Sequence, residues 1–420
     1  MSLSTAESAP PRAPSPAVRR PWLLVFGAVF VCSWSGNQFS PMLLLYRDVE
    51  HYSAGVVTSF LGIYVLGLAP ALVIAGAVSD HIGRRTPMFY AVCFGLMGSL
   101  LLALGEFGSV PIYLGRLVAG MSVGTAMAVG SSWLKEVSSA PYDLRAGKGG
   151  RVRDAGAGAR RASLAFTLGS ALGALVAGSI AQWGPWPEVL PYALHAAATL
   201  PFLWLVRRPP ETVTRQAASA GLRARLAVPS ARHRRFVRVV LVCGPWLFAA
   251  CGLSYGYLPV LLGDEAGGLG LAYATALSVI ALVSGALIQP VAKRIDSTSS
   301  ARGIVVSLAT LAVGLSVMIA AVATGRLVVG AVAGVVFGAG FGIGLVSGLL
   351  EVQRIAPPAD LAKLTGVFYA IAYLGFAVPT ILAALTPPFT TIGLLLVLMV
   401  LLIFSTLAVL ASYRKHLPDG

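Results

Sequence analysis

Charged residues are scarce in this chain of 420 residues. They make up 11% of it, against 57% hydrophobic residues, and the mean hydropathy is +0.81. Because a soluble globular domain is about one quarter charged, this shortage excludes an ordinary soluble protein and predicts several membrane-spanning segments. The short alternating strands of a membrane β-barrel are also missing, so the predicted class is an all-α membrane protein.

Signatures of enzymes and of metal or nucleotide sites are missing as well. No segment matches the phosphate-binding pattern G-x-x-x-x-G-K-[ST], which argues against direct use of ATP. The cysteines all fall inside hydrophobic runs, which leaves neither an extracellular disulfide framework nor a metal-ligand spacing. These four residues are Cys32, Cys93, Cys243 and Cys251. We expect no catalytic residue, no metal and no cofactor.

Twelve hydrophobic runs are present, each near the length of about 20 residues that a helix needs to cross the bilayer. They lie near 22–45, 54–78, 86–104, 110–134, 162–183, 189–206, 237–262, 270–291, 303–323, 326–350, 363–386 and 389–412. Residues 1–21 are rich in Ala, Pro and Ser, which predicts a disordered tail. The run after Pro21 is too long for a signal-peptide core, so we expect it to remain as the first helix.

The net charge of +15 is distributed unevenly. Of the 31 Lys and Arg residues, 28 fall in segments that would lie on one side of the membrane together with both termini, and the exceptions are Arg47, Arg116 and Arg326. This positive-inside bias predicts that both termini are cytoplasmic. It indicates contact with anionic lipids on that side and argues against a nucleic-acid partner.

The most informative motif lies between the second and third runs. Residues 76–85 read Gly-Ala-Val-Ser-Asp-His-Ile-Gly-Arg-Arg, a charged turn with the spacing G-x-x-x-D-x-x-G-R-R. This motif resembles the loop signature between helices two and three of the major facilitator superfamily of transporters. The Arg-Arg-Pro-Pro-Glu-Thr segment at 207–212 is similar to an ending common in that family.

Short segments recur across the middle of the chain. Residues 115–120 correspond to 325–330, the Glu-Val pair at 136–137 to that at 351–352, and 41–44 to 259–262. The correspondence predicts two pseudo-symmetric six-helix bundles, 22–206 and 237–412, joined by a basic cytoplasmic linker at 207–236 and followed by a cytoplasmic tail at 413–420. In the family, parallel repeats of this kind enclose a substrate site near the membrane midplane.

The resemblance assigns roles to a conformational-switch motif. Gly76 would let two helices approach closely, and Arg84 would bridge Asp80 and Glu136. Asp80 would also face the N-terminal end of the eleventh helix, near 360–363. A solvated loop is the alternative. The motif comprises Gly76, Asp80, Gly83, Arg84, Arg85 and Glu136.

Coupling to protons is implied by a second feature. Arg116 precedes Glu136 by 20 residues, about 30 Å along a helix, so it belongs to the outer half. It resembles the family's fourth-helix Arg signature, which is associated with proton coupling; snorkelling to the membrane surface is the alternative. No Asp or Glu lies in the middle of an expected helix. The other titratable candidates are peripheral Asp48 and His195, and His195 would otherwise be a hydrogen-bonded structural residue.

Polar and aromatic side chains at mid-membrane depth are candidates for the substrate cavity. Asn37 and Gln38 are the strongest, because adjacent amides in hydrocarbon need several partners. Packing or interfacial roles are the alternative for the hydroxyls. The candidates are Ser33, Trp34, Asn37, Gln38, Tyr255, Tyr257, Tyr369 and Tyr373.

The predicted function is that of a secondary transporter that moves a small organic solute by alternating access, and the predicted mode is proton-coupled efflux. The exporter signature in the fifth run is degraded, since Gly169, Gly173 and Gly178 are present but Ala174 stands where a proline is expected. Nutrient uptake or exchange, or a sensor without flux, remain alternatives. An excess of 26 Arg over 5 Lys suggests a bacterial cell membrane as the location, and a monomer is expected.

Overall fold

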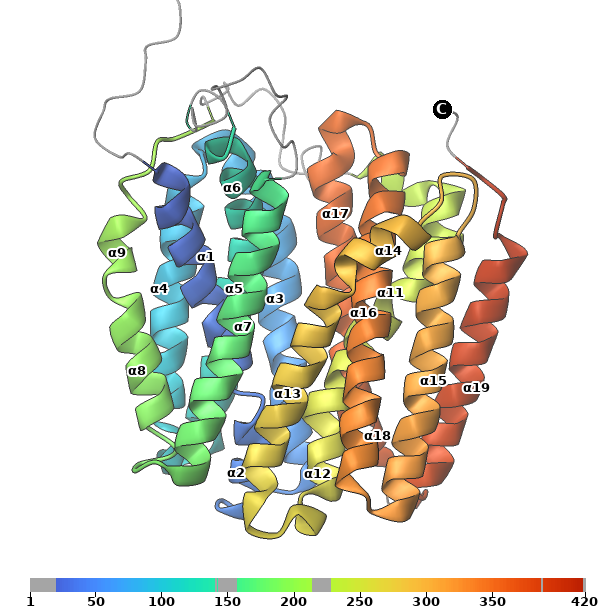
Figure 1. Cartoon of the computed structure of the whole chain (residues 1–420). Coiled ribbons are helices and arrows are strands. Elements are labelled where there is room, and N and C mark those ends of the chain that lie inside the picture. The colour runs from blue at the N-terminus through green and yellow to red at the C-terminus, as the bar shows by residue number, and fades with distance from the viewer. Residues whose placement is uncertain (1–19, 140–141, 143–156, 214–227, 387, 418–420) are drawn as a thin grey trace, which may run out of the picture.

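The structure is a computed structural model that describes residues 20–139, 142, 157–213, 228–386 and 388–417. This part of the chain folds into helices and contains no strand. The helices form two groups that stand side by side, residues 21–205 in one and 236–411 in the other (Figure 1). The predicted all-α class with two helical bundles therefore matches the observed architecture.

The first group will be called the N half and the second the C half. The N half comprises α1 (Pro21–Asn37), α2 (Met42–Asp48), α3 (Ala54–Ile82), α4 (Arg85–Leu102), η1 (Gly105–Phe107), α5 (Ser109–Thr125), η2 (Ala126–Gly130), α6 (Ser131–Val137), α7 (Ala157–Trp183), α8 (Leu190–Thr199) and α9 (Phe202–Leu205). Between the halves lies η3 (Pro229–Arg232). The C half comprises η4 (Phe236–Val240), α11 (Leu241–Cys251), η5 (Gly252–Tyr257), α12 (Leu258–Leu262), η6 (Asp264–Leu269), α13 (Gly270–Leu287), α14 (Gln289–Ile295), α15 (Arg302–Thr324), α16 (Leu327–Ile355), α17 (Pro358–Tyr373), η7 (Leu374–Phe376), α18 (Ala377–Leu385) and α19 (Thr391–Ala411).

Several of these elements join end to end into longer helical segments. Within the described residues, 11 segments are long and apolar enough to cross a membrane. A shorter apolar helix, Leu190–Leu205, supplies the remaining crossing, and Pro201 separates its two parts α8 and α9. Together they agree with the predicted twelve membrane helices.

The chain alternates between two ends of the molecule. Residues 20 and 417 lie at one end, which we call the termini face, together with the turns at 83–84, 206–213 and 296–301 (Figure 1). The opposite end, the far face, carries the turns at 49–53, 184–189 and 263–269. The two faces provide the frame in which the polar clusters are placed below.

The first helix of each half is irregular at the same place. The segment expected as one helix over 22–45 is broken, because α1 ends at Asn37 and α2 begins after Pro41, which has no N–H to continue the ladder. Short turns satisfy the backbone there, since Ser40 N–H donates to the Asn37 carbonyl at 3.1 Å. In the C half, the π-helical η5 interrupts the equivalent helix just before Pro259. The sequence repeat thus corresponds to a repeated helix irregularity, a break in the N half and a π-helical stretch in the C half.

Glycines bring two helix pairs into close contact. A Cβ atom at Gly120 of α5 would lie 2.1 Å from the Tyr64 carbonyl oxygen of α3, and one at Gly124 would lie 2.3 Å from that of Leu68. In the C half, a Cβ at Gly342 of α16 would lie 2.2 Å from the Gly285 carbonyl oxygen of α13. Small residues at such crossings are the usual means of tight packing between membrane helices.

Some predicted boundaries are shifted. The fifth membrane helix, α7, begins at residue 157 rather than 162. The predicted disordered tail and most of the loop between α6 and α7 lie outside the described residues, as do 214–227 of the predicted linker and 418–420 of the predicted C-terminal tail.

Candidate functional site

The signature between α3 and α4 forms a charge cluster at the termini face. The guanidinium of Arg84 donates to Asp80 at 2.6 Å, to the Ser79 hydroxyl at 2.7 Å and to Glu136 at 2.8 Å. Arg84 therefore stands between the two carboxylates that the sequence pairs with it. Burial lowers the pKa of Arg84, but hydrogen bonds and charges from Glu136 and Asp80 outweigh it and raise the pKa above its ordinary value. Arg84 is a permanent cation in this cluster.

The segment after the sixth helix docks onto the same cluster. Glu211 accepts the backbone N–H groups of Arg84 at 2.8 Å and Arg85 at 3.0 Å, and so caps the start of α4. The Thr212 hydroxyl donates to Glu136, and the Arg85 guanidinium donates to the Pro209 carbonyl at 2.8 Å. Residues 207–213 are thus part of the N half rather than a free linker.

Two glycines of the signature differ in what they do. Gly83 has φ +96°, a conformation that L side chains rarely adopt, and a Cβ there would lie 2.4 Å from a Glu211 carboxylate oxygen. Glycine is therefore required at 83 for both its backbone and its space. A Cβ at Gly76 would meet only Ala128 at 3.6 Å, an ordinary contact. The expected close approach of helices at Gly76 is wrong.

The expected contact between Asp80 and the eleventh helix is not among the polar contacts of the described residues. Its side chain is 42% exposed, and its ion-pair partner in this part of the chain is Arg84. At the start of α17, Asp360 instead accepts from the Ser230 hydroxyl at 2.9 Å and lies 3.9 Å from Lys363. Asp360 at the start of α17 thus contacts η3 and Lys363 of its own helix, and not Asp80.

The C half has its own charge cluster at the termini face, which sequence reasoning missed. Arg235 is fully buried and donates through two nitrogens to Glu351, at 2.6 and 3.0 Å. Its remaining nitrogen donates to the carbonyls of Ser412, Tyr413 and Lys415 just after α19. Arg354 pairs with Asp296. The cluster corresponds to that of Arg84, but its arginines come from the start of the seventh membrane helix and the end of the tenth.

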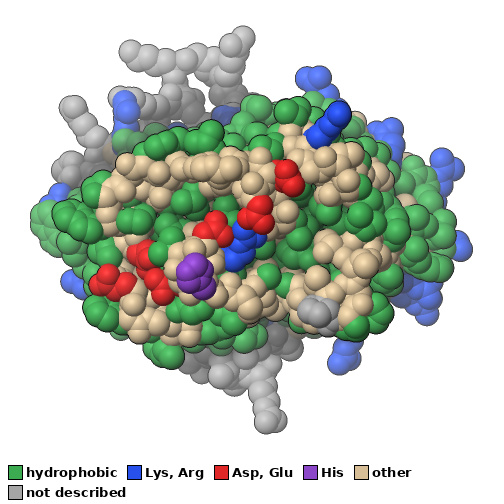
Figure 2. Space-filling view, turned by 90° about the horizontal axis from the view of Figure 1, so that it is seen from below, with side chains coloured by type: hydrophobic (Ala, Val, Ile, Leu, Met, Phe, Trp, Pro, Cys, Tyr) green, Lys and Arg blue, Asp and Glu red, His purple; other side chains and the backbone are tan. Residues whose placement is uncertain are grey.

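Polar bonds join the two halves at the far face. Arg47, at the end of α2, donates to Asp264 at 2.8 Å and to the Val260 carbonyl. Gln182 of α7 donates to the Gly268 carbonyl at 2.7 Å, and Thr380 of α18 donates to the Thr58 carbonyl at 2.7 Å. Figure 2 shows this face with Asp and Glu side chains gathered around a basic side chain and a histidine. Asp48 accepts from Arg47 at 2.8 Å and is half exposed.

Arg116 is buried in the N half. It is 2% exposed, so the snorkelling alternative is wrong. Its guanidinium carbon lies 4.2 Å from the ring centroid of Tyr64 and 4.5 Å from that of Phe39. It donates to the carbonyls of Gly36 at 3.0 Å and Phe60 at 3.2 Å.

His195 lies in a hydrogen-bonded network inside the N half. Its Nδ1 is 2.7 Å from the Ser99 hydroxyl, and its Nε2 is 2.9 Å from the Val31 carbonyl oxygen. Gln38 donates to the same Ser99 hydroxyl at 2.8 Å. This network links α1, α4 and α8, and the residue is fully buried. His195 thus has the hydrogen-bonded structural placement that was the alternative to a proton relay.

Three cavity candidates of the first helix face the interior of the N half instead. Ser33 bonds to α7 through the Phe166 carbonyl and the Ser170 hydroxyl, both at 2.8 Å. The Trp34 indole lies edge-on to His195, with ring centroids 5.6 Å apart. Gln38 bonds to α4 as described. Asn37 differs, because it is only partly buried and accepts from neighbouring Ser40. Of the four, Asn37 alone is not fully buried.

The tyrosine candidates lie near the seam between the halves. Tyr373 stacks on Phe248 with ring centroids 3.7 Å apart, and its hydroxyl donates to the sulfur of Met127 in the N half at 3.3 Å. Tyr255 packs against Phe376 in the same cluster. Tyr257 is buried, and Tyr369 is partly buried beside Phe368.

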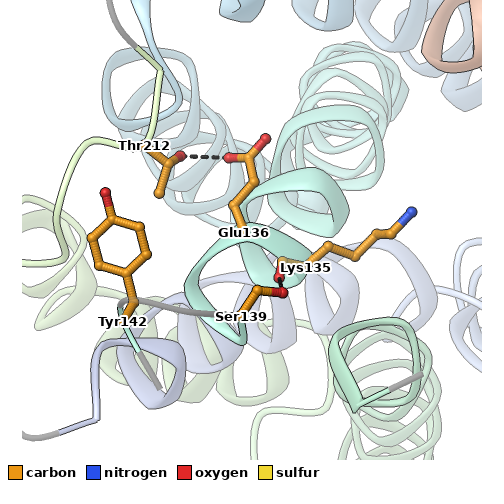
Figure 3. A pocket seen from close by; sticks show the side chains of 5 residues that line it. All are labelled: Lys135, Glu136, Ser139, Tyr142 and Thr212. Carbon is orange, nitrogen blue, oxygen red and sulfur yellow. Dashed lines mark hydrogen bonds between the residues drawn. The ribbon is translucent and has the colours of Figure 1, made fainter. Parts of the chain in front are cut away.

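A pocket of about 400 Å³ opens at the termini face beside the signature cluster (Figure 3). Glu136 and Thr212 are hydrogen-bonded to each other in its wall, while Lys135 extends away from them. The residues that line it are Lys135, Glu136, Ser139, Tyr142 and Thr212. All of them belong to the N half, so this pocket is separate from the seam between the halves.

Two helical bundles, a charge cluster after the second helix and its counterpart in the second bundle define a membrane transporter built from repeats. The sequence model of the Major Facilitator Superfamily matches residues 23–380. The chain belongs to this family, and the predicted membership is confirmed.

Similar proteins agree with this assignment. Two uncharacterized MFS-type transporters of Bacillus subtilis (strain 168) match parts of the chain: YceJ is 29% identical over 106 residues and YfiU 38% identical over 71. These stretches cover 25% and 17% of this chain and only 26% and 13% of the two relatives.

Solved structures share the fold over nearly the whole chain. A D-xylose-proton symporter has a TM-score of 0.68 at 16% identity, with 95% of this chain and 98% of the symporter covered. The nucleoside transporter NupG has a TM-score of 0.71 at 14% identity, covering 94% and 99%. A POT family transporter in complex with a thioalcohol-conjugated peptide reaches 0.73 at 14% identity, covering 94% and 96%.

Proposed function

We propose that the protein carries a small organic solute across a bacterial cell membrane by alternating access to a site between its halves, with the termini face in the cytoplasm. The observation that carries this proposal is how the polar bonds are distributed. At the termini face the two charge clusters stay within single halves, and the bond from Ser163 of α7 to Gln289 of α14, at 3.2 Å, crosses the seam on that side of the molecule. At the far face Arg47, Gln182 and Thr380 bond across the seam. Two internally braced bodies joined by a few polar bonds are suited to rocking.

The orientation rests on charge. Apart from Arg326, the exposed basic residues lie toward the termini face. The far-face turns carry acidic residues, namely Asp48, Glu50, Glu106, Glu188, Asp264 and Glu265. The positive-inside rule then places the termini in the cytoplasm, next to anionic lipids. The protein works as a monomer in this proposal.

Proton-coupled efflux is the proposed mode. Its support is the carboxyl group cluster at the far face, where protons would enter from outside. Burial raises the pKa of Glu188 above its ordinary value, and Glu50 and Glu106 raise it further. Asp48 lies at the same face and remains a coupling candidate together with Arg116. His195 is the weakest of the three candidates, because both ring nitrogens are bonded within the bundle.

The switch motif is proposed to set the balance between inward- and outward-open states. Asp80→Asn removes a charge 2.6 Å from Arg84 while keeping the size of the side chain. Transport is expected to fall sharply while substrate binding survives. If the variant loses substrate binding while it still changes between the inward- and outward-open states, this role is refuted. The matched control is Glu265→Gln, which removes a carboxylate at the far face.

Uptake or exchange is the second candidate. It is favoured by the fold neighbours, which include a D-xylose-proton symporter and a nucleoside transporter. Accumulation of labelled organic compounds in energised membrane vesicles of both orientations separates the modes. Uncoupler-sensitive accumulation in everted vesicles supports efflux, and accumulation only in right-side-out vesicles supports uptake. Binding without accumulation in either supports a sensor and contradicts transport.

A further inference from the structure

Arg116 carries a buried charge with no carboxylate partner in the described part of the chain. The ion pairs there involve other residues, and each described Asp or Glu lies in a turn or within about one turn of a helix end. Two carbonyl oxygens accept from Nε and Nη1 of Arg116. A guanidinium has five N–H donors, so this set leaves hydrogen-bonding capacity and a full positive charge. Ionisable groups buried in a membrane usually pair or mark a functional site.

The surroundings of Arg116 connect it to the seam between the halves. The Tyr64 ring covers its guanidinium at 4.2 Å. Tyr64 belongs to the same buried cluster as Tyr255, Tyr373 and Phe376 of the C half. The backbone comes close here as well, since a Cβ at Gly256 would lie 2.8 Å from Leu61 of α3, one turn from Tyr64. A positive charge thus adjoins an aromatic surface that both halves share.

We infer that Arg116 is the fixed counter-charge for the solute, which is a small organic monoanion with an aromatic or apolar body. The carboxylate or similar anionic group of the solute would accept hydrogen bonds from the guanidinium. The aromatic or apolar part of the solute would lie against Tyr64, Tyr255 and Tyr373. This inference rests on the proposed function and specifies the substrate class. Charged hydrogen bonds to a buried guanidinium are strong, because the solute anion neutralises a charge that the helices leave unpaired.

The test compares acids with their neutral amides. The full-length protein in detergent is titrated with benzoate, salicylate and 1-naphthoate, and in parallel with benzamide, salicylamide and 1-naphthamide, while its melting temperature is followed. At least one acid should stabilise the protein more than its amide does. If every amide stabilises as much as its acid, or if no acid stabilises at all, the inference is wrong.

Variants test whether Arg116 is the residue that causes the preference for the acid over its amide. R116Q should weaken acid binding by at least about tenfold, whereas R116K should keep a preference for the acid. Arg326 directly precedes α16 at the repeat-related position and is exposed, so R326Q is the matched control and should bind as the native protein does. Equal loss in R116Q and R116K would show that Arg116 acts through packing and would overturn the inference. If R116Q does not fold, the native acid–amide comparison and R116K decide.

Flux separates this inference from the proposed function. Labelled salicylate, or whichever acid binds, is loaded into proteoliposomes with the native protein and R116K. Arg116-dependent binding without flux would refute transport but leave the anion site standing. Flux of neutral or cationic compounds that is unaffected by R116Q would support transport and overturn the anion site.

Discussion

Arg47 and Asp264 form an ion pair across the seam of the molecule, 2.8 Å between nitrogen and oxygen, at the far face. Arg47 ends α2 of the N half, and Asp264 follows α12 of the C half. The same guanidinium donates to the Val260 carbonyl, which anchors it to the backbone of the C half. Any separation of the halves at this face must break these bonds.

Breaking this pair should open the far face more often. R47Q removes both cross-seam bonds, and exposed ion pairs contribute up to about 1 kcal/mol, so the open population should rise by up to about fivefold. The rate at which a membrane-impermeant maleimide labels a T58C variant, with the native cysteines replaced by Ala, reports on this opening, because Thr58 is buried beside the Thr380 contact.

The charge swap R47D/D264R should return the labelling rate toward that of the parent, and E265Q should not change it. An unchanged rate in R47Q would mean that other contacts, such as that of Gln182 with Gly268, keep this face closed.

The Arg235–Glu351 pair should contribute to stability far more than the Arg84–Glu136 pair. Both Arg235 and Glu351 are at most 1% exposed, whereas the Glu136 side chain is 30% exposed. Removing one member of a buried pair costs about 3–5 kcal/mol, because the other charge is left uncompensated. E351Q should therefore lower the melting temperature of the purified protein much more than E136Q does.

The double variant R235M/E351L supplies the control for this prediction. It removes both charges together, so it should be less destabilised than R235M alone, which loses the same bonds to the carbonyls after α19 and leaves Glu351 uncompensated. Additive losses in the double variant would mean that the two side chains act independently.

Local hydrophobic runs predicted the number of membrane helices, whereas the Asp80–Arg84–Glu136 cluster was implied by the resemblance to the family, since Glu136 lies 52 residues from Arg84. Hydrophobic runs define helices one by one, and Asp80 and Arg84 are one helical turn apart. Arg235 and Glu351 lie 116 residues apart. The internal repeat relates Glu351 to Glu136, but no pattern pointed to Arg235 as its partner, so only the fold brings the two together. Glu211 was visible within the Arg-Arg-Pro-Pro-Glu-Thr segment, but its partners are backbone N–H groups, which no sequence pattern displays.

The candidates for the substrate cavity show a second limit of prediction from the sequence. Polar residues in the first helix were selected by depth, but depth does not tell which neighbour a side chain meets. Successive residues of a helix point about 100° apart, so adjacent amides face different partners. Gln38 meets α4, whereas Asn37 keeps an exposed surface. That distinction depends on how α1 is rotated in the bundle.

Asn37 and Gln38 should respond differently to alanine. Gln38→Ala removes the bond to Ser99 and with it one link between α1 and α4, which should cost about 1 kcal/mol of stability and leave substrate affinity nearly unchanged. Asn37→Ala should weaken affinity by about 0.5–3 kcal/mol without lowering the melting temperature. Binding and melting are measured for both variants. If both variants have the substrate affinity and the melting temperature of the native protein, helix α1 does not contribute to the substrate site.

The carboxyl group of Glu188 should make the stability of the far face depend on pH. Burial raises its pKa above the ordinary value of 4.5, and the charges of Glu50 and Glu106 raise it further. A raised pKa means that the folded protein holds this proton more tightly than the unfolded chain does. The stabilisation is therefore present below the ordinary pKa and is lost as the pH rises through the raised one.

The native protein should accordingly melt at a higher temperature relative to E188Q at about pH 5 than at about pH 7. Taking this difference between the two proteins cancels the titration of other groups. E265Q removes an exposed carboxylate from the same face outside this cluster, and it should leave the pH dependence intact. If the melting temperatures of the native protein and E188Q change in parallel with pH, Glu188 holds no extra proton in the folded state. The far-face carboxyl cluster would then lose its support as the entry point for coupled protons.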